Sequence, residues 1–428
     1  EHVSTRRAFL HRGLTLIGTA ATVPVFLERS AHALAAGTTS RSALRDGRIL
    51  VVVQLAGGND GLNTVIPVRN DDYYRARPQL GIARKDGLAL TDEIALHPAL
   101  TGFKSLFDDG RLAIVQGVGY PNPDRSHFKS TDIWQTASPD GRLRTGWIGR
   151  YFDSTCKGSE RPDPQAGIAL TSEAPLGMIG RKFSPVAFQR PDSLTWKSGP
   201  PDEGRRRRAR GSMPDPAYAA FEQLNQPGRS RSRISQLDYL QRTALDARMS
   251  AADIQRASAG RSAADYPGTP IAQSLRTVAR MITANMPTKI YYVSQSGYDT
   301  HQGQSNRHAQ LLGQLGAAIK AFVDDLASTG HLDRVTLMTF SEFGRRVEEN
   351  ASGGTDHGTA APMFLVGAHL RPGLHGRMPS LETLDAGDLV YTTDFRSVYA
   401  AVLQHWMGAD ARTILQHPGP PLPLFEKI

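Results

Sequence analysis

"RILVVVQLAGGNDGLNTVIPV", residues 48–68, is a continuous apolar run that leads into two glycines and an Asn-Asp pair. Strands that are buried on both faces of a parallel sheet have this pattern, because helices cover the sheet on both sides. Glycine permits the tight turn that a strand needs at its carboxyl end. The segment therefore predicts a central strand that delivers Asp60 to a loop at one edge of the sheet.

The same pattern recurs in four later segments. They are residues 111–128, 288–301, 333–346 and 361–368. Residues 97–110 and 306–330 lie between them, with apolar residues spaced three and four apart as in amphipathic helices. Strands that alternate with such helices predict an α/β fold, with a mostly parallel central sheet flanked by helices on both faces.

We expect residues 36–428 to form a single α/β hydrolase-like domain. Residues 156–288 break the alternation of strands and helices. We interpret them as a helical insertion or cap over the active edge, and the alternative is that these helices only flank the sheet. Within this region, the arginine-rich stretch 197–233 predicts a flexible, solvent-facing loop.

Residues 1–35 have the pattern of a twin-arginine signal peptide. Arg6 and Arg7 precede a moderate apolar stretch and an Ala-x-Ala cleavage site, so the mature chain is expected to begin near Ala36. The apolar stretch is too short for a membrane span, which argues against an integral membrane protein. The pattern predicts export by the twin-arginine machinery to the bacterial periplasm or beyond; the alternative is an N-terminal helix of the domain.

Composition excludes several classes of protein. The formal net charge is +9, but the excess is concentrated in 197–233, so we do not predict binding to nucleic acid. Cys156 is the single cysteine, so neither an intrachain disulfide nor a thiolate metal cluster is possible. The P-loop, dinucleotide-binding and G-x-S-x-G motifs are absent from the sequence.

Polar residues that can ligate a metal follow or precede the predicted strands. The candidate ligands are Asp60, Asp299, His301, Glu342, Asp356 and His357. Carboxylates and imidazoles suit a divalent ion such as zinc, manganese, magnesium or calcium, and ligands in sheets of this type lie at the strand ends. Two alternatives remain open: Glu342 forms an ordinary salt bridge with a nearby arginine, and Asp356–His357 belongs to a simple turn.

Ser126 lies where the loop after residues 111–120 is predicted to become a helix. Free backbone amides and the positive end of the helix dipole favour an anion there, and a metal ion could activate the hydroxyl as a nucleophile. Arg125 and His127 flank it and can bind phosphate or sulfate oxygens. The alternative is that Ser126 is only the N-cap of the helix.

Five ordered motifs resemble an exported family catalogued as domain of unknown function 1501, over nearly the whole chain as far as Trp406. They are LAGGNDGLNTVIP, QGVGYPNPDRSHFKSTDIWQT, GYDTHQGQ, MTFSEFGRRVEENASGGTDHGTAAPMFLVG and YTTDFRSVYAAVL. That family in turn resembles, more weakly, the alkaline phosphatase superfamily, which includes sulfatases and phosphomutases. The resemblance implies an alkaline-phosphatase-like fold and a metal-dependent site.

On the superfamily pattern, Asp60 matches the metal-binding aspartate after the first strand. Ser126 falls at the position of the nucleophile. Asp299 and His301 resemble the ligands of one metal, at a closer spacing than the superfamily usually has.

The later motifs depart from the pattern. In "SEFGR", where the superfamily often has Ser-Asp-His-Gly, Glu342 takes a ligand position and Phe343 replaces a histidine. His357, beside Asp356, resembles the late metal-binding histidine before a Pro-led strand. These departures imply one ion, two unequal ions, or none.

The residues and the resemblance together predict an exported metal-dependent hydrolase of phosphate or sulfate esters, with Ser126 as nucleophile. Its substrate would be an anionic ester of a small molecule or a glycan, and Arg125 or Arg345 would assist the oxyanion. One alternative is a metal-activated water that attacks without a covalent intermediate. Another is a non-catalytic exported binding or assembly protein that reuses the fold.

Overall fold

The computed structural model describes residues 47–155, 163–194, 250–417 and 419–426. The predicted signal peptide 1–35, Cys156 and the basic loop 197–233 lie outside the described residues. In the described ranges, no helix is long and apolar enough to cross a membrane.

The protein is built around a nine-stranded sheet with the strand order β11-β5-β10-β9-β1-β8-β6-β7, in which β14 also pairs with β5. The strands are β1 (Ile49–Ala56), β5 (Leu112–Gly119), β6 (Gly167–Ala169), β7 (Val186–Ala187), β8 (Ile290–Ser296), β9 (Val335–Phe340), β10 (Ala361–Gly367), β11 (Gly373–His375) and β14 (Thr393–Asp394). The segment that opens the sequence, β1, lies inside the sheet and pairs in parallel with both β8 and β9. The predicted mostly parallel sheet is confirmed.

β10 runs against its neighbours. It pairs antiparallel with both β9 and β5, whereas β5 pairs in parallel with β11 and β14. The amino end of β10 therefore lies at the same edge of the sheet as the carboxyl ends of β1, β5, β8 and β9. The loop that enters β10 thus meets the loops that leave the other four strands.

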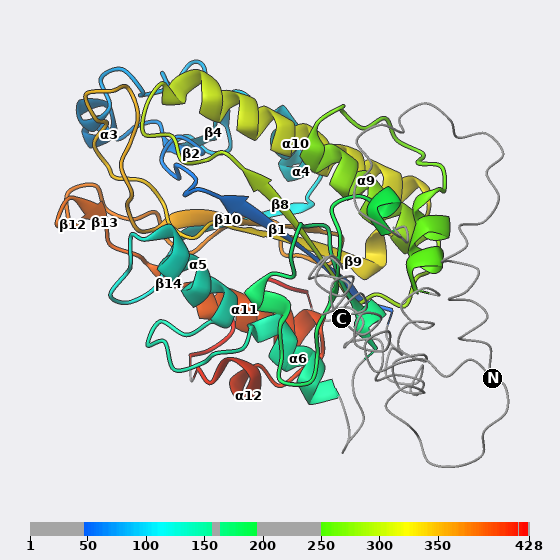
Figure 1. Ribbon diagram of the computed structural model, residues 1–428. Helices are drawn as coiled ribbons and strands as arrows, with labels where there is room; N and C mark the ends of the chain where they lie inside the picture. Colours follow the sequence, from blue (N-terminus) through cyan, green and yellow to red (C-terminus); the bar gives the residue numbers. More distant parts are fainter. Residues whose placement is uncertain (1–46, 156–162, 195–249, 418, 427–428) are drawn as a thin grey trace, which may run out of the picture.

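Helices cover both faces of the sheet, as predicted (Figure 1). One layer contains α4 (Thr101–Asp108), α9 (Pro270–Thr283) and α10 (Gln304–Ser328); the other contains α5 (His127–Thr136), α6 (Trp147–Thr155), α11 (Phe395–Ala401) and α12 (Ala411–Leu415). Side chains of β1 alternate between the two cores: Val51 and Val53 pack with the first layer, and Leu50 and Val52 with the second. This alternation is why a strand buried on both faces is apolar throughout.

The described parts of 156–288 are built into the main layers. β6 and β7 extend the sheet beyond β8, and α9 packs against α10. The remainder lies outside the described residues, so the cap stays a prediction. Smaller elements complete the fold: α3 (Asp71–Ala76), a sheet of β2 (Val65–Pro67), β4 (Ile94–Leu96) and β3 (Leu88–Ala89), and a hairpin of β12 (Leu384–Asp385) and β13 (Asp388–Leu389).

The crossing of α4 and α10 gives a test of the packing. A Cβ on Gly102 would lie 2.3 Å from the carbonyl oxygen of Gly316, so the two helices approach closely at this glycine. We expect Gly102→Ala to lower the free energy of unfolding by about 1–3 kcal/mol through overpacking, measured by urea denaturation. Gly313→Ala is the control, because its Cβ would meet nothing closer than 3.7 Å. There, the better helix propensity of alanine should raise stability by about 1 kcal/mol, and equal stabilities of the two variants would contradict the close crossing.

Candidate metal centre

A buried arginine joins the loops at the edge of the sheet. Arg345, which follows β9, has a side chain that is 0% exposed. Its guanidinium donates to the carbonyls of Gly58 (2.8 Å), Thr355 (2.9 Å), Tyr298 (2.9 Å) and Gly57, and to Asp299 Oδ1 (2.8 Å). The loops after β1, β8 and β9 and before β10 are thereby held around one side chain.

His127 is the first residue of α5, after β5. Its Nδ1 lies 2.9 Å from Glu342 Oε1, which also accepts the backbone N–H of Gly57 at 2.7 Å. A carboxylate oxygen accepts hydrogen bonds, so Nδ1 of His127 carries the proton and donates it. His127 Nε2 is consequently the free nitrogen; it is buried and finds no hydrogen-bond partner among the described residues.

His301 is oriented in the same way. Its Nδ1 lies 3.0 Å from Asp356 Oδ1, so the ring again donates to a carboxylate and presents Nε2 on the other side. The hydrogen bond from His301 lowers the pKa of Asp356, which keeps this carboxylate in its accepting form. Asn350 Nδ2 also donates to Asp356 Oδ1, at 3.2 Å.

His357 donates to a backbone carbonyl instead of a carboxylate. Its Nδ1 lies 2.8 Å from the carbonyl oxygen of Arg125. Burial lowers the pKa of His357, so the neutral ring is favoured. In this tautomer the Nε2 of His357 is a lone-pair donor.

The three Nε2 atoms converge on one carboxylate oxygen. Asp299 Oδ1 lies 3.1 Å from Nε2 of His301, 3.1 Å from Nε2 of His357 and 3.5 Å from Nε2 of His127. The Nε2 atoms of His301 and His357 are 2.9 Å apart. Four atoms that all carry lone pairs repel one another unless a proton or a cation lies between them.

The spacing fits a metal site. Ligand atoms at about 2.0–2.1 Å from a tetrahedral zinc ion lie about 3.3 Å from one another. The ligand atoms of His127, Asp299 and His357 all lie within 4.8 Å of one another, and Nε2 of His301 lies 3.1 Å from Asp299 Oδ1 and 2.9 Å from Nε2 of His357. Imidazoles that donate through Nδ1 to a carboxylate or carbonyl while Nε2 faces inward are the usual second-shell arrangement of metal-binding histidines. Partial burial would raise the pKa of Asp299, but the hydrogen bond and positive charge of Arg345 lower it to about 2, so it is ionised.

Phe343 fixes the spacing of two imidazoles. Its ring lies 4.9 Å from that of His127 and 4.7 Å from that of His357, centroid to centroid. A Cβ on Gly58, which has φ +79°, would fall 2.4 Å from the Phe343 ring. Phe343 is therefore an apolar spacer between the two imidazoles.

Most of the predicted metal ligands are brought together here, in two shells. Asp299, His301 and His357 face the centre, whereas Glu342 and Asp356 lie behind histidines and orient them. His127, predicted to bind a substrate oxyanion, instead joins Asp299 and His357 in the inner set. The signal available in the sequence was its place after β5, at the same sheet edge as the other ligands.

Asp60 is engaged elsewhere. Its side chain and that of Arg77 are both 0% exposed, and they form an ion pair of 2.6 Å. Gln304 Nε2 donates to the same oxygen, and the backbone N–H of Asn63 donates to the other oxygen at 3.4 Å. Arg77 also donates to the carbonyl of Val347 at 2.9 Å, so the pair fastens the loop after β9.

The predicted catalytic residues Ser126 and Arg125 lie beside the cluster. Ser126 is the N-cap residue of α5; its side chain is exposed and does not cap the helix, while its N–H donates to Asp124 Oδ1 at 2.8 Å. The guanidinium of Arg125 forms an ion pair with Asp388. The side chain of Arg125 is therefore paired with Asp388, and the backbone carbonyl of the same residue contacts the cluster, by accepting the N–H of His357 Nδ1.

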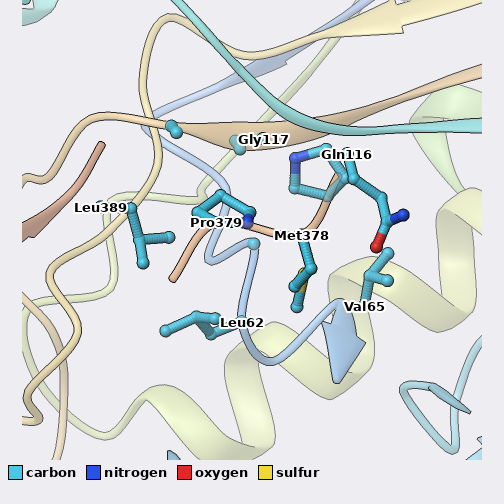
Figure 2. Close-up of a pocket in the computed structure, with 11 residues that line it drawn as sticks. Leu62, Val65, Gln116, Gly117, Met378, Pro379 and Leu389 are labelled. Carbon is cyan, nitrogen blue, oxygen red and sulfur yellow. The ribbon is translucent and has the colours of Figure 1, made fainter. Parts of the chain in front are cut away.

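A small apolar hollow opens near the same edge, between segments 61–65, 116–117, 360–362 and 378–389 (Figure 2). Leu62, Val65, Met378 and Leu389 surround it, with Gln116 at one side. Its cavity volume of about 20 Å³ is room for a single water molecule. Gln116 Oε1, which is buried without a hydrogen-bond partner in the described residues, is a suitable acceptor for that water.

The fold and the cluster define an α/β protein with a histidine-rich centre at the strand ends of its sheet. The chain belongs to the family described as Protein of unknown function (DUF1501), whose model matches residues 48–424. The predicted resemblance to this family is confirmed. No curated protein matches the chain.

Several solved structures are similar to the chain at low identity. Ps i-CgsB in complex with k-i-k-neocarrahexaose has 9% identity and a TM-score of 0.37, over 88% of this chain and 75% of that one. The lipoteichoic acid synthase LtaP from Listeria monocytogenes has 10% identity and a TM-score of 0.32, over 81% and 73%. A protein in the alkaline phosphatase superfamily from Vibrio parahaemolyticus has 8% identity and a TM-score of 0.32, over 83% and 71%. TM-scores below 0.5 carry no conclusion about activity.

The Asp60–Arg77 pair predicts a structural effect of mutation. We expect Asp60→Asn to lower the free energy of unfolding by about 3–5 kcal/mol, because it leaves Arg77 buried without its counter-charge. Although burial raises the pKa of Asp60, Arg77 lowers it below the usual 3.8. The contribution is therefore complete above pH 3.8 and is lost as the pH falls through the folded-state pKa. Urea denaturation at several pH values measures this.

The control is Asp92→Asn. Asp92 is 88% exposed and lies 3.6 Å from Arg69, so its loss should cost less than about 1 kcal/mol. An Asp60→Asn protein with wild-type stability but without bound metal would show that Asp60 is a ligand instead.

Proposed function

We propose that this chain is a metal-dependent hydrolase of phosphate or sulfate esters that acts outside the bacterial cytoplasm. The observation that carries the proposal is that three Nε2 atoms lie within 3.5 Å of Asp299 Oδ1, each from an imidazole whose Nδ1 already has a hydrogen-bond partner. Of these, His127 and His357 form with Asp299 a group of ligand atoms within 4.8 Å of one another. Three imidazoles and one carboxylate that are oriented in this way suit a cation better than a set of structural hydrogen bonds.

The inner residues would hold one divalent ion: His127, Asp299, His301 and His357. Nitrogen-rich donors favour zinc over manganese, magnesium and calcium, which suit oxygen ligands better. A bound ion would polarise an ester oxygen and lower the pKa of a hydroxyl or water next to it. Glu342 and Asp356 would keep the histidines in the ligating tautomer.

The start of α5 supports an anionic substrate. The first-turn amides of this ten-residue helix have no partner within the helix and carry the positive end of its dipole. Ser126 is the N-cap residue at this end of the helix, immediately before His127, and its hydroxyl makes no capping bond. We assign Ser126 as the nucleophile: its hydroxyl would lose its proton and attack the phosphorus or sulfur of the bound ester, the bond to the ester oxygen would break, and the alcohol would leave with a proton. Water would then hydrolyse the seryl ester, which releases phosphate or sulfate and restores the serine.

The predicted location follows from the sequence of residues 1–35. Paired Arg6 and Arg7 support export by the twin-arginine machinery, which carries folded proteins with their metal loaded. An anionic ester of a small molecule or a glycan would then be met in the periplasm or outside the cell.

Metal content tests the site. We expect the chelator-treated protein to take up about one Zn²⁺ per chain, and His357→Ala or Asp299→Asn to weaken binding by at least about 100-fold through loss of an inner ligand. Glu342→Gln should weaken it by about 10–100-fold, because His127 loses its orienting carboxylate. Competition with a chromogenic chelator measures the affinities.

His405→Ala is the control, since His405 is exposed in the helical turn Val402–Trp406. It should bind zinc as the wild type does. A folded wild-type chain that takes up neither zinc nor manganese would overturn the metal site and with it the hydrolase.

Ser126→Ala tests the nucleophile. With p-nitrophenyl phosphate and p-nitrophenyl sulfate as substrates, we expect kcat to fall by at least about 1,000-fold, because the attacking hydroxyl is removed. Zinc affinity and thermal midpoint should not change, since the side chain of Ser126 makes no capping bond.

Ser352→Ala, at an exposed serine in the loop before Asp356, is the matched control and should keep full activity. Full activity in Ser126→Ala would show that Ser126 is not the nucleophile and would favour attack by a metal-activated water. A wild-type chain that binds metal but hydrolyses no ester would favour the non-catalytic binding role.

A further inference from the structure

Arg125 contacts the cluster and the β12–β13 hairpin through opposite parts of the residue. Its backbone carbonyl accepts the N–H of His357 Nδ1 at 2.8 Å, and its guanidinium forms an ion pair with Asp388 of β13. Only a protonated nitrogen donates to a carbonyl oxygen, so this contact places the proton of the neutral ring on Nδ1. Nε2, which faces Asp299, is then left with its lone pair. The position of one carbonyl therefore determines whether His357 can act as a ligand.

Asp388 is well placed to fix that carbonyl. Its side chain is 1% exposed, and a second arginine, Arg346, places Nε 3.8 Å from Asp388 Oδ1. A buried carboxylate is strongly unfavourable without a cation nearby, so the hairpin and the two arginines are held together. Asp388 lies outside the inner and orienting shells described above.

The second arginine leads to the other side of the cluster. The backbone N–H of Arg346 donates to the carbonyl of Asp356 at 3.0 Å, and its guanidinium donates to the carbonyl of Ala386 in the hairpin at 3.3 Å. Thr359 Oγ1 also donates to the carbonyl of Leu389. The hairpin thus contacts both the loop before α5 and the loop between β9 and β10.

We propose that Asp388 is a positioning residue for the candidate metal centre. Through Arg125, it holds the backbone carbonyl against His357 Nδ1. Through Arg346, it holds the loop that carries Asp356 and His357. The inference rests on the proposed metal site, but the tautomer of His357 tests it in the metal-free chain.

The first experiment reads the tautomer directly. Histidine-labelled, metal-free protein is studied by long-range ¹H–¹⁵N NMR, with the His357 signals assigned by their absence from His357→Ala. In the wild type we expect the proton on Nδ1. In Asp388→Asn, which removes the charge and keeps the shape, we expect a mixture of Nδ1–H and Nε2–H forms, because the carbonyl of Arg125 is released.

The second experiment measures zinc affinity by chelator competition. Asp388→Asn should bind zinc about 10–100-fold more weakly, as expected when a ligand loses its orienting partner. Arg125→Ala breaks the same ion pair from a side chain that is 42% exposed, and it should have a similar effect. The double variant should bind zinc no more weakly than Asp388→Asn alone, because the Arg125–Asp388 ion pair that Arg125→Ala removes is already lost in Asp388→Asn.

The control is Asp385→Asn, on β12 opposite Asp388 and exposed. It should keep the wild-type tautomer and affinity. If Asp388→Asn does not fold, Arg125→Ala supplies both readouts.

Two failures are distinguishable. Wild-type tautomer and affinity in both Asp388→Asn and Arg125→Ala would overturn the positioning role and leave the metal site intact. A wild-type chain without zinc affinity would overturn the metal site, while the tautomers of the metal-free chains would still decide the role of Asp388.

Discussion

The guanidinium of Arg345 is the interaction on which the edge of the sheet depends. It is fully buried, and its acceptors are backbone carbonyls from the loops after β1 and β8 and before β10, together with Asp299. Without Arg345, several buried carbonyls would lose their partner, and each such loss costs about 1–3 kcal/mol. The guanidinium also donates to Asp299 Oδ1, which faces the imidazoles. The same side chain therefore both packs the loops and orients a candidate ligand.

The sequence predicts which apolar runs form buried strands of the sheet. Runs at 49–56, 290–296 and 335–340 became parallel strands of the central sheet because residues apolar on both faces fit only between two helical layers. The direction of a strand is not encoded in such a run: Ala361–Gly367 reads the same whichever way it enters the sheet. Its antiparallel pairing with β5 and β9 places Asp356 and His357, which precede the strand, at the edge where the other strands end.

The residue types of the candidate site were predictable from the sequence. Which residues face its centre, and which lie behind and orient them, was not. Residue type says which atoms can ligate a metal, while the partner of the other ring nitrogen decides which atom faces inward. That partner is distant in sequence: Glu342 for His127, and Asp356 for His301. Asp60 has the same motif context as a ligand, yet a buried arginine 17 residues later satisfies its charge.

The formal charge of the cluster is compatible with a divalent ion. The carboxylates of Asp299, Glu342 and Asp356 supply three negative charges, and Arg345 supplies one positive charge, which leaves −2 around neutral imidazoles. Burial lowers the pKa of His357 and disfavours the charged form of this ring. A single divalent cation, as proposed above, would balance the charge and interact with the converging lone pairs at once. The adjacent Asp356 and His357 therefore have separate tasks: the aspartate turns His301 toward the centre, and the histidine enters it.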